Sequence, residues 1–213
     1  MPLKDKLESK KGTLIELLFF FVSACSTLPM FITGPILYGL GLSSLGIRKT
    51  EWKDIGFAFA DFTLKRIGIG IVVAIAYYFA HQYVIDPLLS AITQPGLPEI
   101  FSMKGNILKL AIGLTLSWTT AAFFEEILFR GYLINRFIDL TGDGLVAKIS
   151  IVLLSGLAFG FVHCYQGLYG AMSAGIIGIF QATVYFLARK KLAIPIIAHG
   201  VYDTIGFTLL FIG

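Results

Sequence analysis

Charged side chains are scarce in this chain. Asp, Glu, Lys and Arg make up 14% of the 213 residues, whereas hydrophobic residues make up 56%. Soluble domains contain about 25% charged residues, so this balance excludes an ordinary soluble domain and predicts an integral membrane protein. The apolar residues form long unbroken runs without strict alternation, so we expect transmembrane helices and not a β-barrel.

Cysteine, histidine and clustered basic residues are also few. The two cysteines, Cys25 and Cys164, show no CxxC spacing, so we expect small buried side chains and no disulfide framework. The HExxH motif, in which two zinc ligands flank a general base, does not occur. The net charge of +4 comes from basic residues that flank the apolar runs. They form no stripe with interleaved aromatics, so nucleic acid is not an expected partner.

The apolar runs predict an all-α, multi-pass bundle of about six membrane segments. The first, residues 13–42, contains Pro29 and Pro35 and should be kinked or broken. The others are expected at the following ranges: 67–85, from Asn106 as N-cap to about 140, two within the charge-free stretch 149–188 with a turn near 165–170, and 192–213. A loop is expected at 93–98.

Basic residues also indicate how the bundle is oriented. Ten of them, in the stretches 48–66 and 189–191 and at Arg136 and Lys148, would lie on the cytoplasmic side under the positive-inside rule. We expect a single integrated membrane domain, in which residues 1–105 supply an N-terminal arm and two segments and residues 106–213 form the catalytic core.

Ionisable residues interrupt three of these apolar segments. A charge at membrane depth costs about 2.5–3.5 kcal/mol on insertion scales, so such residues are candidates for function. They are Glu125, Glu126 and Arg130 in the third segment, His163 in the fourth, and His199 and Asp203 in the last. Each alone has a structural explanation, such as a tether between helices or a buried histidine. Because three segments each carry such groups, we expect them to meet in a polar cavity inside the bundle.

Helical spacing separates the roles of the two glutamates. Glu126 and Arg130 are four residues apart and should pair on one face, whereas Glu125 points about 100° away and should be the freer carboxylate. A carboxylate in an apolar pocket is a suitable general base for water, and His163 and His199 can transfer protons or donate to an oxyanion. Tyr77, Tyr78, His81 and Tyr83 are instead expected in an aromatic belt at the membrane interface.

These residues resemble the motifs of the CPBP family, the intramembrane glutamic endopeptidases related to type II CAAX prenyl proteases. The first motif, EExxxR, is matched by Glu125, Glu126 and Arg130; the second, FxxxH, by Phe159 and His163; and the third, HxxxN or HxxxD, by His199 and Asp203. The resemblance covers roughly residues 106–213.

The resemblance implies a role for each motif residue. Glu125 would activate water with help from His163, His199 and Asp203 would bind the oxyanion, and Phe159 would shape the cavity. An ionised aspartate cannot donate a hydrogen bond, so Asp203 would have to be protonated or would orient His199. No metal or cofactor is implied, and the partners would be the lipid bilayer and a membrane-associated peptide or protein substrate.

Three functions therefore remain open from the sequence. The leading one is an intramembrane endopeptidase that cuts near the membrane face, in a prokaryotic cell membrane. The second is a non-catalytic scaffold or bacteriocin-immunity-type protein of the same family. The third is a zinc-dependent membrane protease in which Glu125, His163 and His199 hold the metal.

Overall fold

The computed structural model describes residues 3–25, 30–94 and 103–213, and every regular element in these ranges is helical. Five helices there are long and apolar enough to cross a membrane: Leu64–Ser90, Ile107–Thr141, Leu145–Val162, Cys164–Leu187 and Ala193–Ile212. Large apolar side chains on them face outward, among them Val72 (65% exposed) and Leu108 (68%). The prediction of a multi-pass helical membrane protein is confirmed.

The first apolar segment is divided between two helices. After the short α1 (Leu3–Glu8), α2 runs over Lys10–Ala24 and α3 over Met30–Arg48. Pro29 lies outside the described residues, and Pro35 lies inside α3. The described part of the expected loop at 93–98 is limited to Thr93 and Gln94.

A connection of two short 3-10 turns, Trp52–Ile55 and Phe59–Asp61, leads from α3 to the next long helix. Gly56 follows the first turn with φ of +91°, a conformation that L side chains rarely adopt. Its carbonyl accepts a hydrogen bond from the Leu192 amide (2.9 Å). The backbone at Gly56 is thereby fixed against the turn that precedes the last helix.

The second crossing is α4 (Leu64–Ala80), which continues through a π-helical turn, His81–Ile85, into α5 (Asp86–Ser90). Of the residues expected in an aromatic belt, Tyr83 is 71% exposed. Tyr77 and His81 are only 4% and 8% exposed, because Tyr77 stacks on Phe180 and the His81 ring hydrogen-bonds Ser173 (2.8 Å). The belt prediction is therefore wrong for these two residues.

The third crossing is one long helix of mixed geometry. It comprises α6 (Ile107–Leu116), π-helical segments at Ser117–Glu125 and Ile127–Leu133, and α7 (Ile134–Thr141). The expected N-cap is confirmed, since the Asn106 side chain accepts from the Lys109 amide. The sequence argument assumed regular α-helix around Glu125 and Glu126, whereas the structure has wider π-helical turns, which occur frequently at functional sites.

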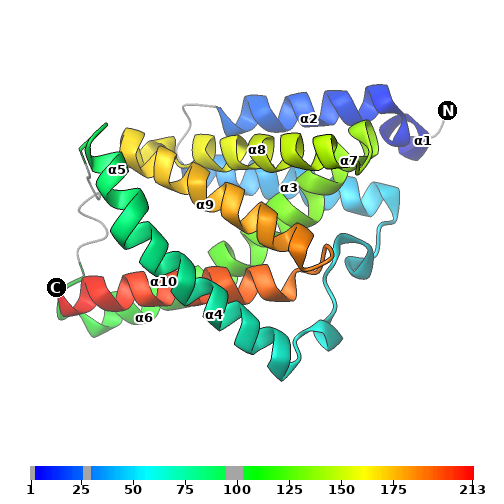
Figure 1. Cartoon of the computed structure of the whole chain (residues 1–213). Helices are drawn as coiled ribbons and strands as arrows, with labels where there is room; N and C mark the ends of the chain where they lie inside the picture. Colours follow the sequence, from blue (N-terminus) through cyan, green and yellow to red (C-terminus); the bar gives the residue numbers. More distant parts are fainter. Residues whose placement is uncertain (1–2, 26–29, 95–102) are drawn as a thin grey trace.

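The last three crossings are α8 (Leu145–Val162), α9 (Gly167–Leu187) and α10 (Ala193–Ile212), with a 3-10 turn at Cys164–Gln166 between α8 and α9. Small residues bring α8 and α9 together: a Cβ on Gly156 would lie 2.9 Å from the Gly175 carbonyl oxygen. In Figure 1, α2 and α8 lie together on one side of the bundle and α6 with α10 on the other, and the long α6–α7 helix joins the two sides.

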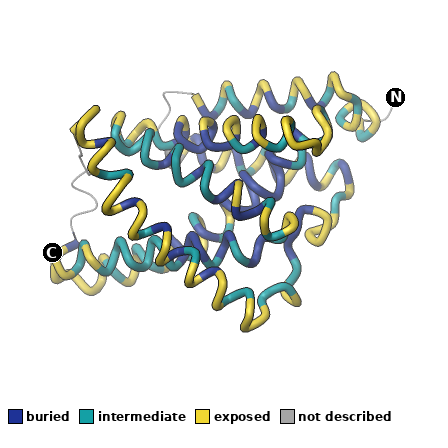
Figure 2. Tube along the Cα trace, in the orientation of Figure 1, coloured by how far each residue is buried: buried dark blue, intermediate teal, exposed yellow. Residues whose placement is uncertain are grey.

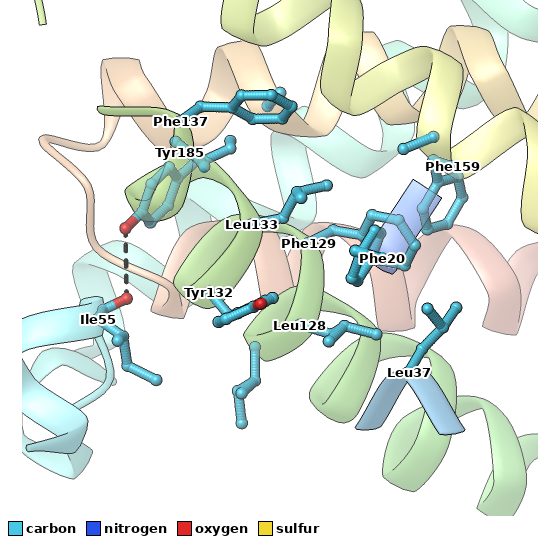
Figure 3. Packing of buried hydrophobic residues seen from close by; sticks show 14 of the residues in the cluster. Phe20, Leu37, Ile55, Leu128, Phe129, Tyr132, Leu133, Phe137, Phe159 and Tyr185 are labelled. Carbon is cyan, nitrogen blue, oxygen red and sulfur yellow. Dashed lines mark hydrogen bonds between the residues drawn. The ribbon is translucent and has the colours of Figure 1, made fainter. Parts of the chain in front are cut away.

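The core surrounds the middle of the long helix, where every residue of Ile127–Leu133 is buried (Figure 2). Phe129 packs edge-on against Phe20 of α2 (ring centroids 5.8 Å apart) and Phe159 of α8 (4.9 Å), as Figure 3 shows. The two cysteines, by contrast, are free and exposed. Our prediction that they are buried is wrong, because Cys25 directly follows α2 and Cys164 lies in the 3-10 turn between α8 and α9.

Candidate active site

Glu126 lies at the centre of the polar cluster and is fully buried. Its Oε1 atom lies 3.2 Å from Nη1 of Arg130 on the same helix and 2.8 Å from Nδ1 of His199 on α10. Since a carboxylate oxygen accepts, His199 Nδ1 donates in this contact. The expected pair between Glu126 and Arg130 is present, and it extends to a second helix.

Arg130 connects this cluster to α8 and α9. The residue is fully buried, and its Nη2 atom donates to the carbonyl of Gly178 on α9 (3.0 Å). Its guanidinium also lies over the ring of Phe159 on α8, 5.0 Å from the centroid, within the range of a cation–π interaction. Phe159 thus lies against the buried guanidinium of Arg130.

Gln181 of α9 belongs to the same network, although the sequence analysis did not single it out. Its Nε2 atom donates to the Pro195 carbonyl (3.1 Å) and to Glu126 Oε1 (3.4 Å), and the residue is 2% exposed. The available signal was an amide side chain inside the charge-free stretch 149–188, where a polar group needs a partner.

Glu125 has different surroundings from its neighbour. It is 8% exposed, and its side chain forms no hydrogen bond with the residues that the structure describes. Its charge interacts with those of His199, Asp203, Glu126 and Arg130. Glu126 therefore links the residues of the hydrogen-bond network, whereas the Glu125 carboxylate forms no hydrogen bond with any described residue of that network.

His163 directly follows α8, and one of its ring nitrogens is already hydrogen-bonded. Its Nδ1 atom donates to the carbonyl of Phe159 (2.7 Å), and its ring lies 4.6 Å from that of Phe159 and stacks on Tyr165 (6.0 Å). With the proton on Nδ1, the neutral ring retains a lone pair on Nε2 that can accept a proton or a hydrogen bond.

His199 and Asp203 lie one turn apart on α10. His199 Nε2 is 3.7 Å from Asp203 Oδ2, which is the range of an ion pair but too long for a hydrogen bond. Asp203 instead accepts a hydrogen bond from the Ser117 hydroxyl (2.7 Å), a residue that the sequence analysis did not identify. The direct hydrogen bond that orients His199 comes from Glu126 and not from Asp203.

The structure therefore brings the ionisable residues of three separate crossings into one interior cluster. Within the described residues, the arrangement combines a buried carboxylate that forms no hydrogen bond, a histidine whose Nε2 forms none, and a second histidine between two carboxylates. Such a set can activate water and stabilise a developing negative charge. In the described ranges, no three His, Cys, Asp or Glu side chains are arranged to hold a metal ion.

Comparison with known proteins agrees with the motifs. Residues 107–205 match the family model described as type II CAAX prenyl endopeptidase Rce1-like. The matched range contains every motif residue from Glu125 to Asp203, together with Ser117 and Gln181. No curated protein and no solved structure matches the chain.

Proposed function

Because this chain belongs to the CAAX protease-like family of intramembrane proteases, we propose that it is an endopeptidase in which Glu125 activates water without a metal ion. The observation that carries the proposal is the contrast between the two adjacent glutamates. Glu126 hydrogen-bonds His199, whereas Glu125 is buried beside the same charges and its carboxylate forms no hydrogen bond with the described residues. The substrate would be a membrane-associated peptide or protein, cut near the membrane face.

In the proposed reaction, Glu125 takes a proton from water as the water oxygen attacks the carbonyl carbon of the scissile peptide bond. His163 assists through Nε2, which accepts a hydrogen bond from the attacking water. The carbonyl π bond opens and places a negative charge on oxygen. The oxyanion then re-forms the C=O bond as the C–N bond breaks and its electron pair leaves with nitrogen. Glu125 returns the proton to that nitrogen and is regenerated, so the products are a carboxylic acid and an amine and atoms and charge balance.

We assign the stabilisation of that oxyanion to His199. Its Nδ1–H is held by Glu126, which leaves Nε2–H of an imidazolium free to donate. Asp203 lies 3.7 Å from the same nitrogen and is positioned by Ser117. An ionised Asp203 cannot donate, so its proposed role is to stabilise the positive charge of His199.

The test is cleavage of a library of membrane-proximal peptides in detergent by wild type and by Glu125→Gln. Loss of the general base should lower the rate by about a hundredfold or more, with unfolding temperature preserved. Glu51→Gln, which alters an exposed carboxylate in the connection before α4, should cleave as wild type does. Equal cleavage by wild type and Glu125→Gln would refute the assignment of the base.

A chelator added to the wild type separates the glutamate mechanism from the zinc alternative. Cleavage should be unchanged by the chelator if Glu125 acts without metal. Loss of cleavage on chelation, restored by zinc, would favour Glu125, His163 and His199 as ligands in place of the proposed roles.

The second candidate is a non-catalytic scaffold or bacteriocin-immunity-type protein. One observation favours it: Glu126, Arg130 and Gln181 connect the long helix to α9 and α10, which is what a purely structural tether would do. Folded wild-type protein that cleaves none of the peptides would support this function over the protease.

A further inference from the structure

An apolar groove of about 400 Å³ lies beside the polar cluster. It is formed by the connection before α4, the π-helical segment that leads to Glu125, and the first turns of α10. Aromatic and branched side chains from these elements form most of its walls: Phe57, Phe59, Phe62, Trp118, Phe123 and Ile196. Its volume falls within the range of about 300–1,000 Å³ that is usual for ligand sites.

Several lining residues of the groove are close in sequence to the residues proposed to act in catalysis. Phe124, which also lines it, directly precedes Glu125, and Ile196 is three residues before His199. Trp118 follows Ser117, the residue that hydrogen-bonds Asp203. Residues three apart share a helix face and consecutive Cα atoms are about 3.8 Å apart, so the groove lies alongside the parts of the long helix and α10 that carry Glu125 and His199.

The Trp118 wall is firmly positioned. The indole Nε1–H donates to the Thr204 hydroxyl (3.1 Å), and the ring packs so closely on α10 that a Cβ at Gly200 would lie 2.6 Å from it. Also in the lining, Phe57 packs edge-on against Phe123 with ring centroids 5.2 Å apart. The groove therefore exists before a ligand binds, which reduces the ordering cost of binding.

The residues that line the groove determine which ligands it can bind. Among the described residues, those that line the groove carry no charge. Besides the Trp118 indole, the polar group among them is the Thr119 hydroxyl, which already donates to the Thr115 carbonyl (2.6 Å). The surface offers ring edges and methyl groups, which suit an aromatic or branched aliphatic side chain. A side chain that enters from the membrane–water interface gains apolar burial in the groove, whereas a lipid acyl chain gains little because it leaves equally apolar surroundings in the bilayer.

We propose that this groove binds a large apolar side chain of the substrate, within about two residues of the scissile bond. The inference rests on the proposed protease function for its meaning, because it assigns the specificity of that site. A peptide delivers its side chain to the groove together with the bond to be cut, whereas an isolated lipid does not.

The chain offers a direct reporter of occupancy in Trp118. It contains two tryptophans, so Trp52→Phe leaves Trp118 as the single one, and Glu125→Gln in the same protein prevents turnover. The probe is a lysine-flanked apolar peptide with one bromophenylalanine, added to the protein in nanodiscs. Bromine quenches tryptophan fluorescence on contact, so we expect saturable quenching that the unbrominated phenylalanine peptide reverses and the alanine peptide does not.

A matched pair of variants locates the binding. Thr119→Phe fills the groove and should weaken quenching by about tenfold or more. Thr183→Phe is the control, because Thr183 is also exposed, also donates to the carbonyl four residues earlier (2.8 Å), and lies on α9 away from the groove. Its quenching should equal that of the parent protein.

Two results would overturn the proposal. One is the absence of saturable quenching by the bromophenylalanine peptide. The other is quenching by lipids with dibrominated acyl chains that the phenylalanine peptide cannot displace, which would make the groove a lipid site. Because the readout is binding to an inactive variant, it is independent of cleavage: peptide binding with no cleavage by wild type would refute the protease and leave the groove assignment intact.

Discussion

Replacing Glu126 by glutamine tests whether a buried charge holds the crossings together. Its Oε1 atom receives contacts from Arg130 (3.2 Å), His199 (2.8 Å) and Gln181 (3.4 Å). Glu126→Gln keeps the shape of the side chain but removes its charge. The Arg130 guanidinium, which is fully buried, then keeps the Gly178 carbonyl as its hydrogen-bonding partner but loses its counter-charge.

The expected cost follows from that uncompensated charge. Removing one member of a buried ion pair costs about 3–5 kcal/mol in the free energy of unfolding. For a chain of about 150–250 residues, each kcal/mol lowers the unfolding temperature by about 2–4 °C. Glu126→Gln should therefore lower it by roughly 6–20 °C, which is far outside the error of a thermal scan.

Thermal unfolding in detergent, followed by far-ultraviolet circular dichroism, measures this shift. The control is Asp139→Asn, the same change of carboxylate to amide in another intrahelical pair with arginine. The Asp139 side chain is 47% exposed and lies 3.1 Å from Arg136 Nη1, so its loss should cost less than about 1 kcal/mol. Equal shifts in Glu126→Gln and Asp139→Asn would mean that Glu126 does not act as a buried counter-charge.

Two further predictions concern the connection before α4. Gly56→Ala should lower the free energy of unfolding by more than about 1 kcal/mol, because φ is +91° and the new Cβ would collide with the Lys190 carbonyl. The control is Gly68→Ala, where a Cβ would meet nothing within 4 Å and no such loss is expected. Thermal unfolding of the two variants measures the difference. For Asp61, burial raises the pKa, but hydrogen bonds from Lys191 and from an arginine on α4 outweigh it and hold the pKa below its ordinary value. Asp61 therefore stabilises the fold above its unfolded pKa, and this contribution is lost as the pH falls through the lower folded pKa. When the pH is lowered from about 6 to about 3, the free energy of unfolding should fall less in Asp61→Asn than in wild type. An equal fall in both proteins would contradict this linkage.

The chain's local chemistry is sufficient to predict its crossings. Each apolar run can satisfy its own backbone hydrogen bonds only as a helix in lipid, so run length and interruption indicate where helices lie. The Asn106 cap and the turn between α8 and α9 were predicted on this basis. The pairing of Glu126 with Arg130 was also predictable, because it depends on residues one turn apart.

Contacts between helices depend on how the helices pack, which the local sequence pattern does not predict. The resemblance left open whether Asp203 is protonated or orients His199, and in the structure the hydrogen bond to His199 comes from Glu126 of another helix. Ser117 and Gln181 stand out by no motif in the sequence, and only the fold shows that they hydrogen-bond Asp203 and Glu126.

The sequence by itself determined a helical membrane protein with its ionisable residues in three crossings, since backbone satisfaction and residue spacing are local. Only the tertiary structure decided which of these groups share a hydrogen bond, that π-helical segments lie on both sides of Glu126, and that an apolar groove is lined by Phe124, the residue before Glu125. Those features arise from side chains that are distant along the chain and are packed together by non-local contacts, so their physical cause lies in the assembled bundle.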